Sequence, residues 1–152
     1  MNKKSHYVVA IAGATGAVGV EMIQVLEQRN FPVGALKLLA SARSVGKTMT
    51  FRGADITVEE LRHDSFKGVD IALFSAGASI SREFRQSVVD AGAVMIDNSS
   101  AFRMEKDVPL VIPEVNPADA ATHSGVIANP NCSTILTLVA VAPLHRAFGL
   151  KR

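Results

Sequence analysis

The stretch "AIAGATGAVGVEMIQVLEQ", residues 10–28, joins an apolar run to an amphipathic segment through a glycine-rich turn. Its glycines stand at positions 13, 16 and 19, a G-x-x-G-x-x-G variant of the dinucleotide-binding fingerprint. Glycines allow a tight turn and a close approach of the backbone to a pyrophosphate, and the start of a helix supplies free N–H groups. The stretch therefore predicts a strand, a phosphate-binding turn and a helix. A glycine-rich turn without a ligand is the alternative.

The rest of the chain alternates short β-branched runs with helical patterns, which is typical of a parallel sheet covered by helices. Several runs are continuously apolar, as in strands that are buried on both faces. We therefore predict an α/β fold, Rossmann-like and doubly wound, with a mostly parallel sheet and helices on both faces. The expected strands are residues 7–12, 36–40, 55–58, 71–75, 94–97, 110–112 and 126–128. The expected helices are residues 17–29, 81–91 and 133–148, with Pro143 kinking the last one or ending its regular part.

Composition excludes several classes of protein. A chain of 152 residues with 48% hydrophobic and 20% charged residues suits one folded domain. A net charge of +2, no Trp and a single Tyr argue against a nucleic-acid partner. The longest apolar run, residues 135–144, is shorter than the roughly 20 residues that a membrane span needs, so no membrane partner is expected. The single cysteine excludes an internal disulfide and favours a reducing, cytoplasmic compartment.

The segment after the second expected strand indicates which nicotinamide cofactor would bind. Folds that prefer NAD usually end this strand with Asp or Glu, which holds the ribose 2′-hydroxyl. Here "LKLLASARSVGK", residues 36–47, offers Ser41, Arg43, Ser44 and Lys47 and no acid. A guanidinium and hydroxyls would bind the 2′-phosphate that a carboxylate would repel. The segment favours NADP with Arg43 as its main contact, and an ordinary solvated basic loop is the alternative.

Two further loops follow expected strands, at the sheet edge where open α/β proteins bind ligands. "FSAGAS", residues 74–79, is small and hydroxyl-rich, so it can pass beside a dinucleotide without steric conflict. "IDNSSAFRM", residues 96–104, presents Arg103 behind Asn98 and Ser99. This arginine is either an anion-binding group or a solvated surface charge.

The only cysteine lies in "IANPNCSTILTLVA", residues 127–140, where the last helix is expected to begin. A helix N-terminus stabilises thiolate relative to thiol, and its free N–H groups can stabilise an oxyanion on an attacked carbonyl. Cys132 is therefore a candidate nucleophile. A small, inert, buried cysteine is the alternative.

Six motifs occur in the order "GATGAVG" (13–19), "SARS" (41–44), "FSAGAS" (74–79), "NSSAFRM" (98–104), "PEVN" (113–116) and "NPNCST" (129–134). With them the whole chain resembles the aspartate-semialdehyde dehydrogenases. The resemblance implies that Cys132 is the acyl-thioester nucleophile, that Asn131 helps to hold the substrate carbonyl, and that Arg103, with Asn98 and Ser99, binds phosphate. It implies NADP as cofactor, held by Gly13, Ala14, Thr15, Gly16, Ala17, Val18, Gly19, Ser41, Arg43, Ser44, Ser75, Ala76 and Gly77. The related N-acetyl-glutamyl-phosphate reductases usually have Gly before their cysteine, and Asn131 argues against them.

The family reduces L-aspartyl 4-phosphate to L-aspartate 4-semialdehyde with NADPH, for lysine, threonine and methionine synthesis, and its members are homodimers. The resemblance therefore implies aspartyl phosphate, the semialdehyde and phosphate as ligands, and no metal. A second domain with the catalytic histidine follows in the family, and none of the four histidines here matches that residue. We therefore predict that residues 1–152 form an N-terminal NAD(P)-binding domain that ends in the catalytic-cysteine helix, without the C-terminal substrate and dimerisation domain and inactive alone.

Two other classes of protein remain as rivals. A non-catalytic NADP-binding module or sensor would keep the fold, but it has no need for a cysteine at a helix start behind "NPN". A purely structural domain does not explain the glycine loop and Arg43 together.

Overall fold

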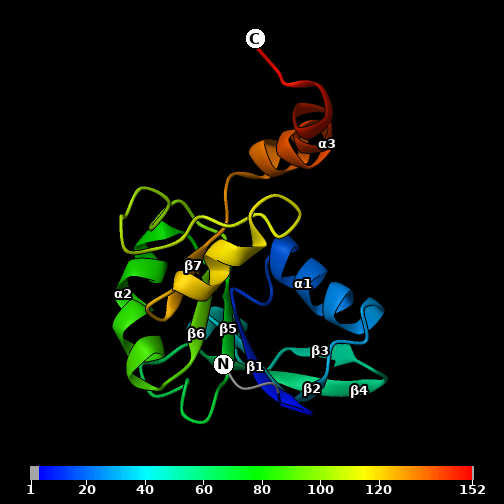
Figure 1. Cartoon of the computed structure of the whole chain (residues 1–152). Coiled ribbons are helices and arrows are strands. Elements are labelled where there is room, and N and C mark those ends of the chain that lie inside the picture. The colour runs from blue at the N-terminus through cyan, green and yellow to red at the C-terminus, as the bar shows by residue number, and fades with distance from the viewer. Residues whose placement is uncertain (1–3, 152) are drawn as a thin grey trace.

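A seven-stranded sheet organises the computed structural model, which describes residues 4–151 (Figure 1). The strands are β1 (Tyr7–Ala12), β2 (Val33–Ala40), β3 (Thr48–Phe51), β4 (Ala54–Glu60), β5 (Ile71–Phe74), β6 (Val94–Asp97) and β7 (Val126–Ala128). The helices are α1 (Ala17–Gln28), α2 (Ala78–Asp90) and α3 (Cys132–Phe148), with 3-10 turns η1 (Ala42–Ser44) and η2 (Pro117–Thr122). The strand order is β3-β4-β2-β1-β5-β6-β7, and only the β3–β4 pair is antiparallel.

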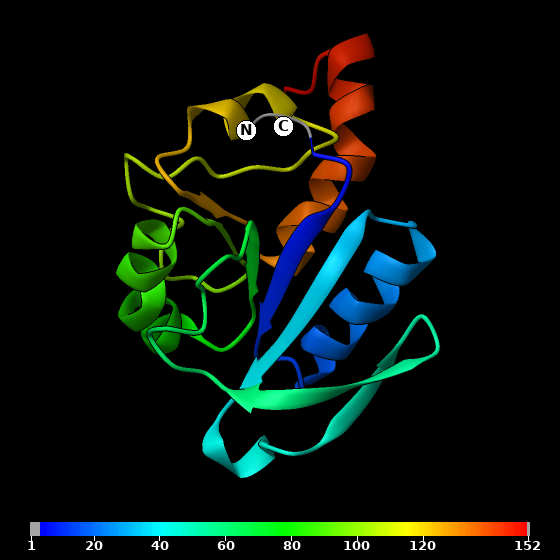
Figure 2. The same ribbon diagram turned by 90° about the horizontal axis from the view of Figure 1, so that it is seen from below.

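The sheet is doubly wound, as predicted. The crossover through α1 leads from β1 to β2 in one direction, and the crossover through α2 leads from β5 to β6 in the other. Because such crossovers are right-handed, the two helices cover opposite faces, as both views of the molecule show (Figures 1 and 2). Ile23 of α1 packs with Ile11 and Leu38 on one face, while Phe84 of α2 packs with Phe74 on the other.

The neighbouring strands β1 and β5 form the topological switch point of the sheet. They pair in parallel, with Ala12 opposite Phe74 at their carboxyl ends. Their following loops turn to opposite faces of the sheet, so a crevice opens between them. The tertiary fold thus brings the glycine turn after β1 next to the "FSAGAS" loop after β5.

The strand prediction is wrong in two places: one expected strand does not form, and one observed strand was not expected. Residues 110–112 form no strand, only an isolated bridge between Leu110 and Ala128. The side chain of Asn116 accepts a hydrogen bond from the Ile112 N–H (2.8 Å) and donates one to the Leu110 carbonyl (2.9 Å), so these backbone groups are not free for a ladder. Conversely, β3 was not predicted. It pairs with β4 in a hairpin at the sheet edge (Figure 2), and the alternation in "TMTF" before the two-residue Arg52-Gly53 turn was the local signal that the prediction overlooked.

The helix boundaries also differ from the prediction in places. Helix α2 begins at Ala78, three residues before the predicted start, because Gly77 (φ 92°) ends the loop. Helix α3 begins at Cys132 and continues through Pro143 to Phe148, so the proline does not end it. None of the described helices is both long and apolar enough to cross a membrane.

Helix α3 stands away from the sheet (Figure 1). It contains no fully buried residue, and Leu136 and Phe148 are 75% and 82% exposed. The guanidinium of Arg146 ties the far half of the helix to the loop before η2, through the Val115 carbonyl (2.8 Å). The apolar surface of this helix is therefore open to solvent in the chain.

Asp70 lies at the amino-terminal edge of the sheet, the edge opposite to the cysteine, and its carboxylate binds the segment that leads into β1. A side-chain hydrogen bond from Lys4, reinforced by the Val8 backbone N–H (2.9 Å), lowers the pKa of the Asp70 carboxyl. Because the folded-state pKa is depressed, this carboxylate adds stability that is present at neutral pH and lost as the pH falls through its pKa.

Candidate active site

A cleft of about 410 Å³ lies at the switch point, on the carboxyl edge of the sheet. The segments that follow β1, β2, β4 and β5 contribute to it, together with helix α2. Six of the residues predicted to bind the cofactor line it, namely Gly13, Thr15, Gly16, Ser41, Ser75 and Ala76. Segments that are far apart in the sequence thus form one concave surface of the size and place expected for a ligand site in an open α/β sheet.

Gly13 is the residue on which the closeness of these loops depends. Its φ of +86° lies in the left-handed region, and a Cβ atom there would lie 2.4 Å from the Ser75 carbonyl oxygen. Its N–H donates to the Leu39 carbonyl of β2 (2.9 Å). A single glycine therefore holds the ends of β1, β2 and β5 together.

The first turn of α1 presents unpaired backbone donors beside the cleft. The N-cap residue is Gly16, and among the described residues no side chain caps this helix end. The first N–H groups of a helix have no partner within the helix, and they carry its positive partial charge. Thr15 adds a hydroxyl that contacts the Ser44 hydroxyl at 3.3 Å. This end of the cleft has the chemistry of an anion site.

The other predicted cofactor residues surround the cleft without lining it. Ala14 and Gly19 are buried beneath the turn, and a Cβ atom on Gly19 would lie 2.3 Å from the Gly13 carbonyl oxygen. Ala17, Val18 and Gly77 are exposed next to it. Arg43 is exposed in η1, the turn that also holds Ser44 beside Thr15.

Sequence reasoning missed one wall of the cleft. This wall consists of Leu61, after β4, and of Ile80, Glu83 and Phe84 of α2. The helical residues stand at positions i, i+3 and i+4, so they share one face of α2 directly after the "FSAGAS" loop. That spacing was the available signal. The packing of Leu61 against this face depends on the tertiary structure.

The thiol of Cys132 is exposed at the first position of α3, so an inert buried cysteine is excluded. The N-cap is Asn131, whose Oδ1 accepts a hydrogen bond from the Ser133 N–H (3.0 Å) and lies 3.9 Å from the sulfur. Because Oδ1 is engaged in capping, the amide Nδ2 of Asn131 is the group left to donate to a ligand. The helix start thus places an exposed thiol, an amide donor and free backbone N–H groups together.

Arg103 is half-buried and connects the loops after β6 and β7. Its Nε donates to the Asn129 carbonyl (2.8 Å), and an Nη donates to the Asn98 carbonyl (3.1 Å). Asn129 lies three residues before Cys132 in the chain. These bonds use only part of the guanidinium fork, so further N–H groups remain for an anion.

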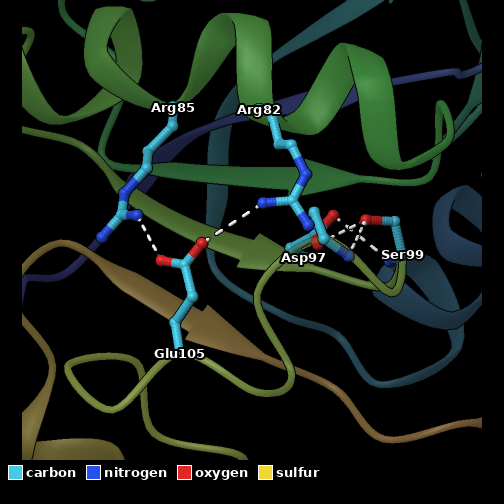
Figure 3. Close-up of polar contacts among 6 residues, drawn as sticks. Arg82, Arg85, Asp97, Ser99 and Glu105 are labelled. Atoms are coloured by element: carbon cyan, nitrogen blue, oxygen red, sulfur yellow. Dashed lines mark hydrogen bonds and ion pairs between the residues drawn. The ribbon is translucent and has the colours of Figure 1, made fainter.

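The two residues predicted beside Arg103 contribute to the loop itself. The Ser99 hydroxyl donates to Asp97 Oδ2 (2.6 Å) and accepts from the Ala101 N–H (3.0 Å), while Asn98 supplies its backbone carbonyl to Arg103. Figure 3 shows Ser99 turned toward Asp97. A role for either side chain in binding phosphate stays a prediction. The described residues contain no cluster of three or more possible metal ligands.

Comparison with known proteins agrees with this geometry. The family model "Semialdehyde dehydrogenase, NAD binding domain" matches residues 8–123. The chain is similar to the aspartate-semialdehyde dehydrogenase of Synechocystis sp., with 55% identity over 95% of this chain and 43% of the relative. The chain thus spans less than half the length of the curated relatives that it matches.

Solved structures show the same similarity. Aspartate semialdehyde dehydrogenase II from Vibrio cholerae, complexed with ASA, superposes with a TM-score of 0.93 and 50% identity over 97% of this chain and 49% of that one. Aspartate semialdehyde dehydrogenase with NADP from Candida albicans superposes with a TM-score of 0.76 and 30% identity, over 95% of this chain and 48% of that one.

Proposed function

Since the chain belongs to the semialdehyde dehydrogenase family, through the NAD-binding domain of that family, we propose that it is the NADP-binding and thiol-bearing part of an aspartate-semialdehyde dehydrogenase. The whole protein would convert L-aspartyl 4-phosphate to L-aspartate 4-semialdehyde in lysine, threonine and methionine synthesis. We infer that the protein lies in the cytoplasm, because a lone exposed thiol suits a reducing compartment. We also infer that the whole protein is a homodimer, in which the open apolar face of α3 is covered by another domain.

One observation carries this proposal. The dinucleotide cleft and the exposed thiol at the start of α3 both follow carboxyl ends of strands in one sheet. A nicotinamide held across that edge and a substrate attached to Cys132 would therefore face each other. A module that only bound nucleotide would not require an exposed cysteine at this edge, at the start of a helix that Asn131 caps.

The residues divide the reaction into two steps. The Cys132 thiolate attacks the acyl carbon, the C–S bond forms, and the C–O bond to phosphate breaks as phosphate leaves toward Arg103. Asn131 Nδ2 donates to the carbonyl oxygen, where negative charge develops. The bound cofactor supplies the hydride that reduces the thioester. The resulting thiohemiacetal collapses to the aldehyde and frees the thiol, so that covalent catalysis replaces one difficult step by two easier ones.

The cleft supports binding of a whole dinucleotide. The uncapped first turn of α1 would take the pyrophosphate. Leu61, Ile80 and Phe84 offer an apolar wall for a flat base. Arg43 stands at the rim beyond Ser41, where the ribose 2′-phosphate would lie, and its guanidinium favours NADP over NAD.

Arg43→Asp is expected to weaken NADP binding by about 10- to 100-fold, the cost of losing a charge-assisted hydrogen bond, and to change NAD binding little. Calorimetric titration with both nucleotides measures this. Lys47→Asp, the same charge change four residues further along the loop, is the matched control. Equal NADP affinity in Arg43→Asp and the parent chain would remove Arg43 from the site.

Cys132 is expected to react with iodoacetamide at pH 7 about three- to tenfold faster than the same thiol in an unstructured peptide "NPNCST", because its sulfur is exposed at the start of α3, beside free backbone N–H groups that can donate to it during the attack. The rate of alkylation, followed by mass spectrometry, measures the difference. The chain in denaturant is the internal control, and its rate should fall to that of the peptide. A folded chain no faster than the peptide would contradict activation by α3.

The proposed activity is tested in a chimera that joins residues 1–152 to the remaining part of the Synechocystis relative. We expect oxidation of NADPH that depends on aspartyl phosphate and is lost in Cys132→Ala. A folded chimera that binds NADPH but does not turn over would favour the rival, a non-catalytic NADP-binding module.

A further inference from the structure

A carboxylate with no solvent exposure lies directly behind the anion-binding loop. Asp97 ends β6 and Ser81 lies in α2, and both residues are 0% exposed. A buried carboxylate is costly unless hydrogen bonds replace its hydration. Here it accepts from the Ser81 hydroxyl (2.7 Å), the Ser99 hydroxyl (2.6 Å) and the Ser99 backbone N–H (3.2 Å). Asp97 is therefore fully satisfied, and it joins helix α2 to the turn after β6.

Hydrogen bonds, joined by short stretches of backbone, connect this carboxylate to the segment that leads to the thiol. Ser99, held by Asp97, follows Asn98 directly, and the Asn98 carbonyl accepts from Arg103 (3.1 Å). Arg103 in turn donates to the Asn129 carbonyl (2.8 Å), in the segment that leads to Cys132. The place of the guanidinium thus depends on the turn that Asp97 fixes.

A second clamp holds the outer side of the same loop. Glu105 pairs with Arg82 (3.3 Å) and with Arg85, both on α2, and Figure 3 shows the two arginines reaching toward it. Arg82 and Glu105 are substantially exposed, and exposed ion pairs contribute little. The loop is therefore fixed mainly by its buried groups: Ala101 and Phe102 anchor it in the core, and the Asp97 contacts fix the Asn98–Ser99 turn whose carbonyl binds Arg103.

We propose that Asp97 is a positioning residue: through Ser99 and the Asn98 carbonyl, it aims the Arg103 guanidinium at the phosphate of a substrate attached to Cys132. This inference rests on the proposed function, because it requires that Arg103 binds phosphate.

The readout compares two alkylating reagents on the full chain. Iodoacetate is anionic and iodoacetamide is neutral. The rate of alkylation of Cys132 by iodoacetate, divided by the rate with iodoacetamide, therefore rises when positive charge is held near the sulfur. A unit charge close by in water changes the ratio by about two- to fivefold. Arg103→Gln defines the ratio without that charge.

Three further variants separate positioning from general stability. Asp97→Asn keeps the size of the side chain but disrupts the acceptor set, and Ser99→Ala removes one link without changing any charge. Ser87→Ala, on the same helix as Ser81 but bonded to His63 (2.7 Å), is the matched control. Melting temperatures by circular dichroism identify variants that do not fold.

We expect Asp97→Asn and Ser99→Ala to lower the ratio toward that of Arg103→Gln, and Ser87→Ala to leave it unchanged. Removing the negative charge of Asp97 would by itself raise the ratio, so a fall can only come from displacement of Arg103. If the ratio falls in Arg103→Gln but stays unchanged in both Ser99→Ala and Asp97→Asn when these variants are folded, the positioning role of Asp97 is overturned while the proposed phosphate site stands. A ratio that is unchanged in Arg103→Gln would overturn both this role and the proposed phosphate site.

Discussion

Turnover of aspartyl phosphate by residues 1–152 alone is expected to equal that of a Cys132→Ala control, although the chain should still bind NADP weakly. The cleft residues that we propose to hold the cofactor all lie within the chain. The groups that would hold the aspartyl carboxylate and amine are expected in a domain outside it. Loss of such positioning can remove a factor of about 10⁵ or more from the rate.

The second requirement is a general acid and base, and none of the four histidines is placed to serve. His6 precedes β1 at the amino edge of the sheet. His63 is bonded to Ser87 of α2, and His123 Nδ1 accepts from the Gly125 N–H (2.9 Å). His145 lies on α3, and the helical rise puts it about 20 Å along the axis from Cys132. Each of the four histidines therefore lies in a part of the fold away from the thiol of Cys132.

An NADPH-consumption assay with aspartyl phosphate, or the reverse reaction with semialdehyde and phosphate, measures the expected absence of turnover. The apolar face of α3 is open, so the chain is expected to self-associate, and the assay should be repeated across protein concentrations with size-exclusion chromatography. Turnover above the Cys132→Ala control would show that no further domain is needed.

The second large effect is expected for Gly13→Ala, which should lower stability by about 2–5 kcal/mol and abolish NADP binding at concentrations that saturate the parent chain. The substitution combines left-handed backbone strain with a Cβ atom placed 2.4 Å from the Ser75 carbonyl oxygen. Relieving that clash must separate the ends of β1 and β5, which are the two sides of the cleft. Thermal melting and nucleotide titration together measure the effect.

Two controls divide this effect into its parts. Gly53→Ala, at φ +77° with open space around it, carries the backbone strain alone. Gly19→Ala has the close contact, 2.3 Å from the Gly13 carbonyl oxygen, without a left-handed φ. We expect Gly53→Ala to cost the least and to leave NADP binding intact. If Gly13→Ala bound NADP like Gly53→Ala, the close approach of the two loops would not matter for the cofactor.

Local sequence patterns were sufficient to predict those elements whose structure depends on residues adjacent in the chain. The glycine turn, the strands 7–12, 94–97 and 126–128, and the start of the last helix at Cys132 follow from periodicity and punctuation within a few residues. The doubly wound sheet follows from the alternation of these elements, because parallel strands require crossovers of one hand. The family resemblance, which the family model over residues 8–123 confirms, rests on motifs that are likewise local.

By itself, then, the sequence determined the fold class, the cleft-forming turn and the place of Cys132 at a helix start. Only the tertiary structure decided that the thiol of Cys132 is exposed and that Leu61 packs beside Phe84 in the cleft wall. It also removed residues 110–112 from the sheet, because the side chain of Asn116 binds their backbone groups. It also decided that Ser99 binds the buried Asp97. The physical reason is that hydrogen-bond partners from distant segments compete for the same groups, and the outcome depends on which segments the fold places side by side.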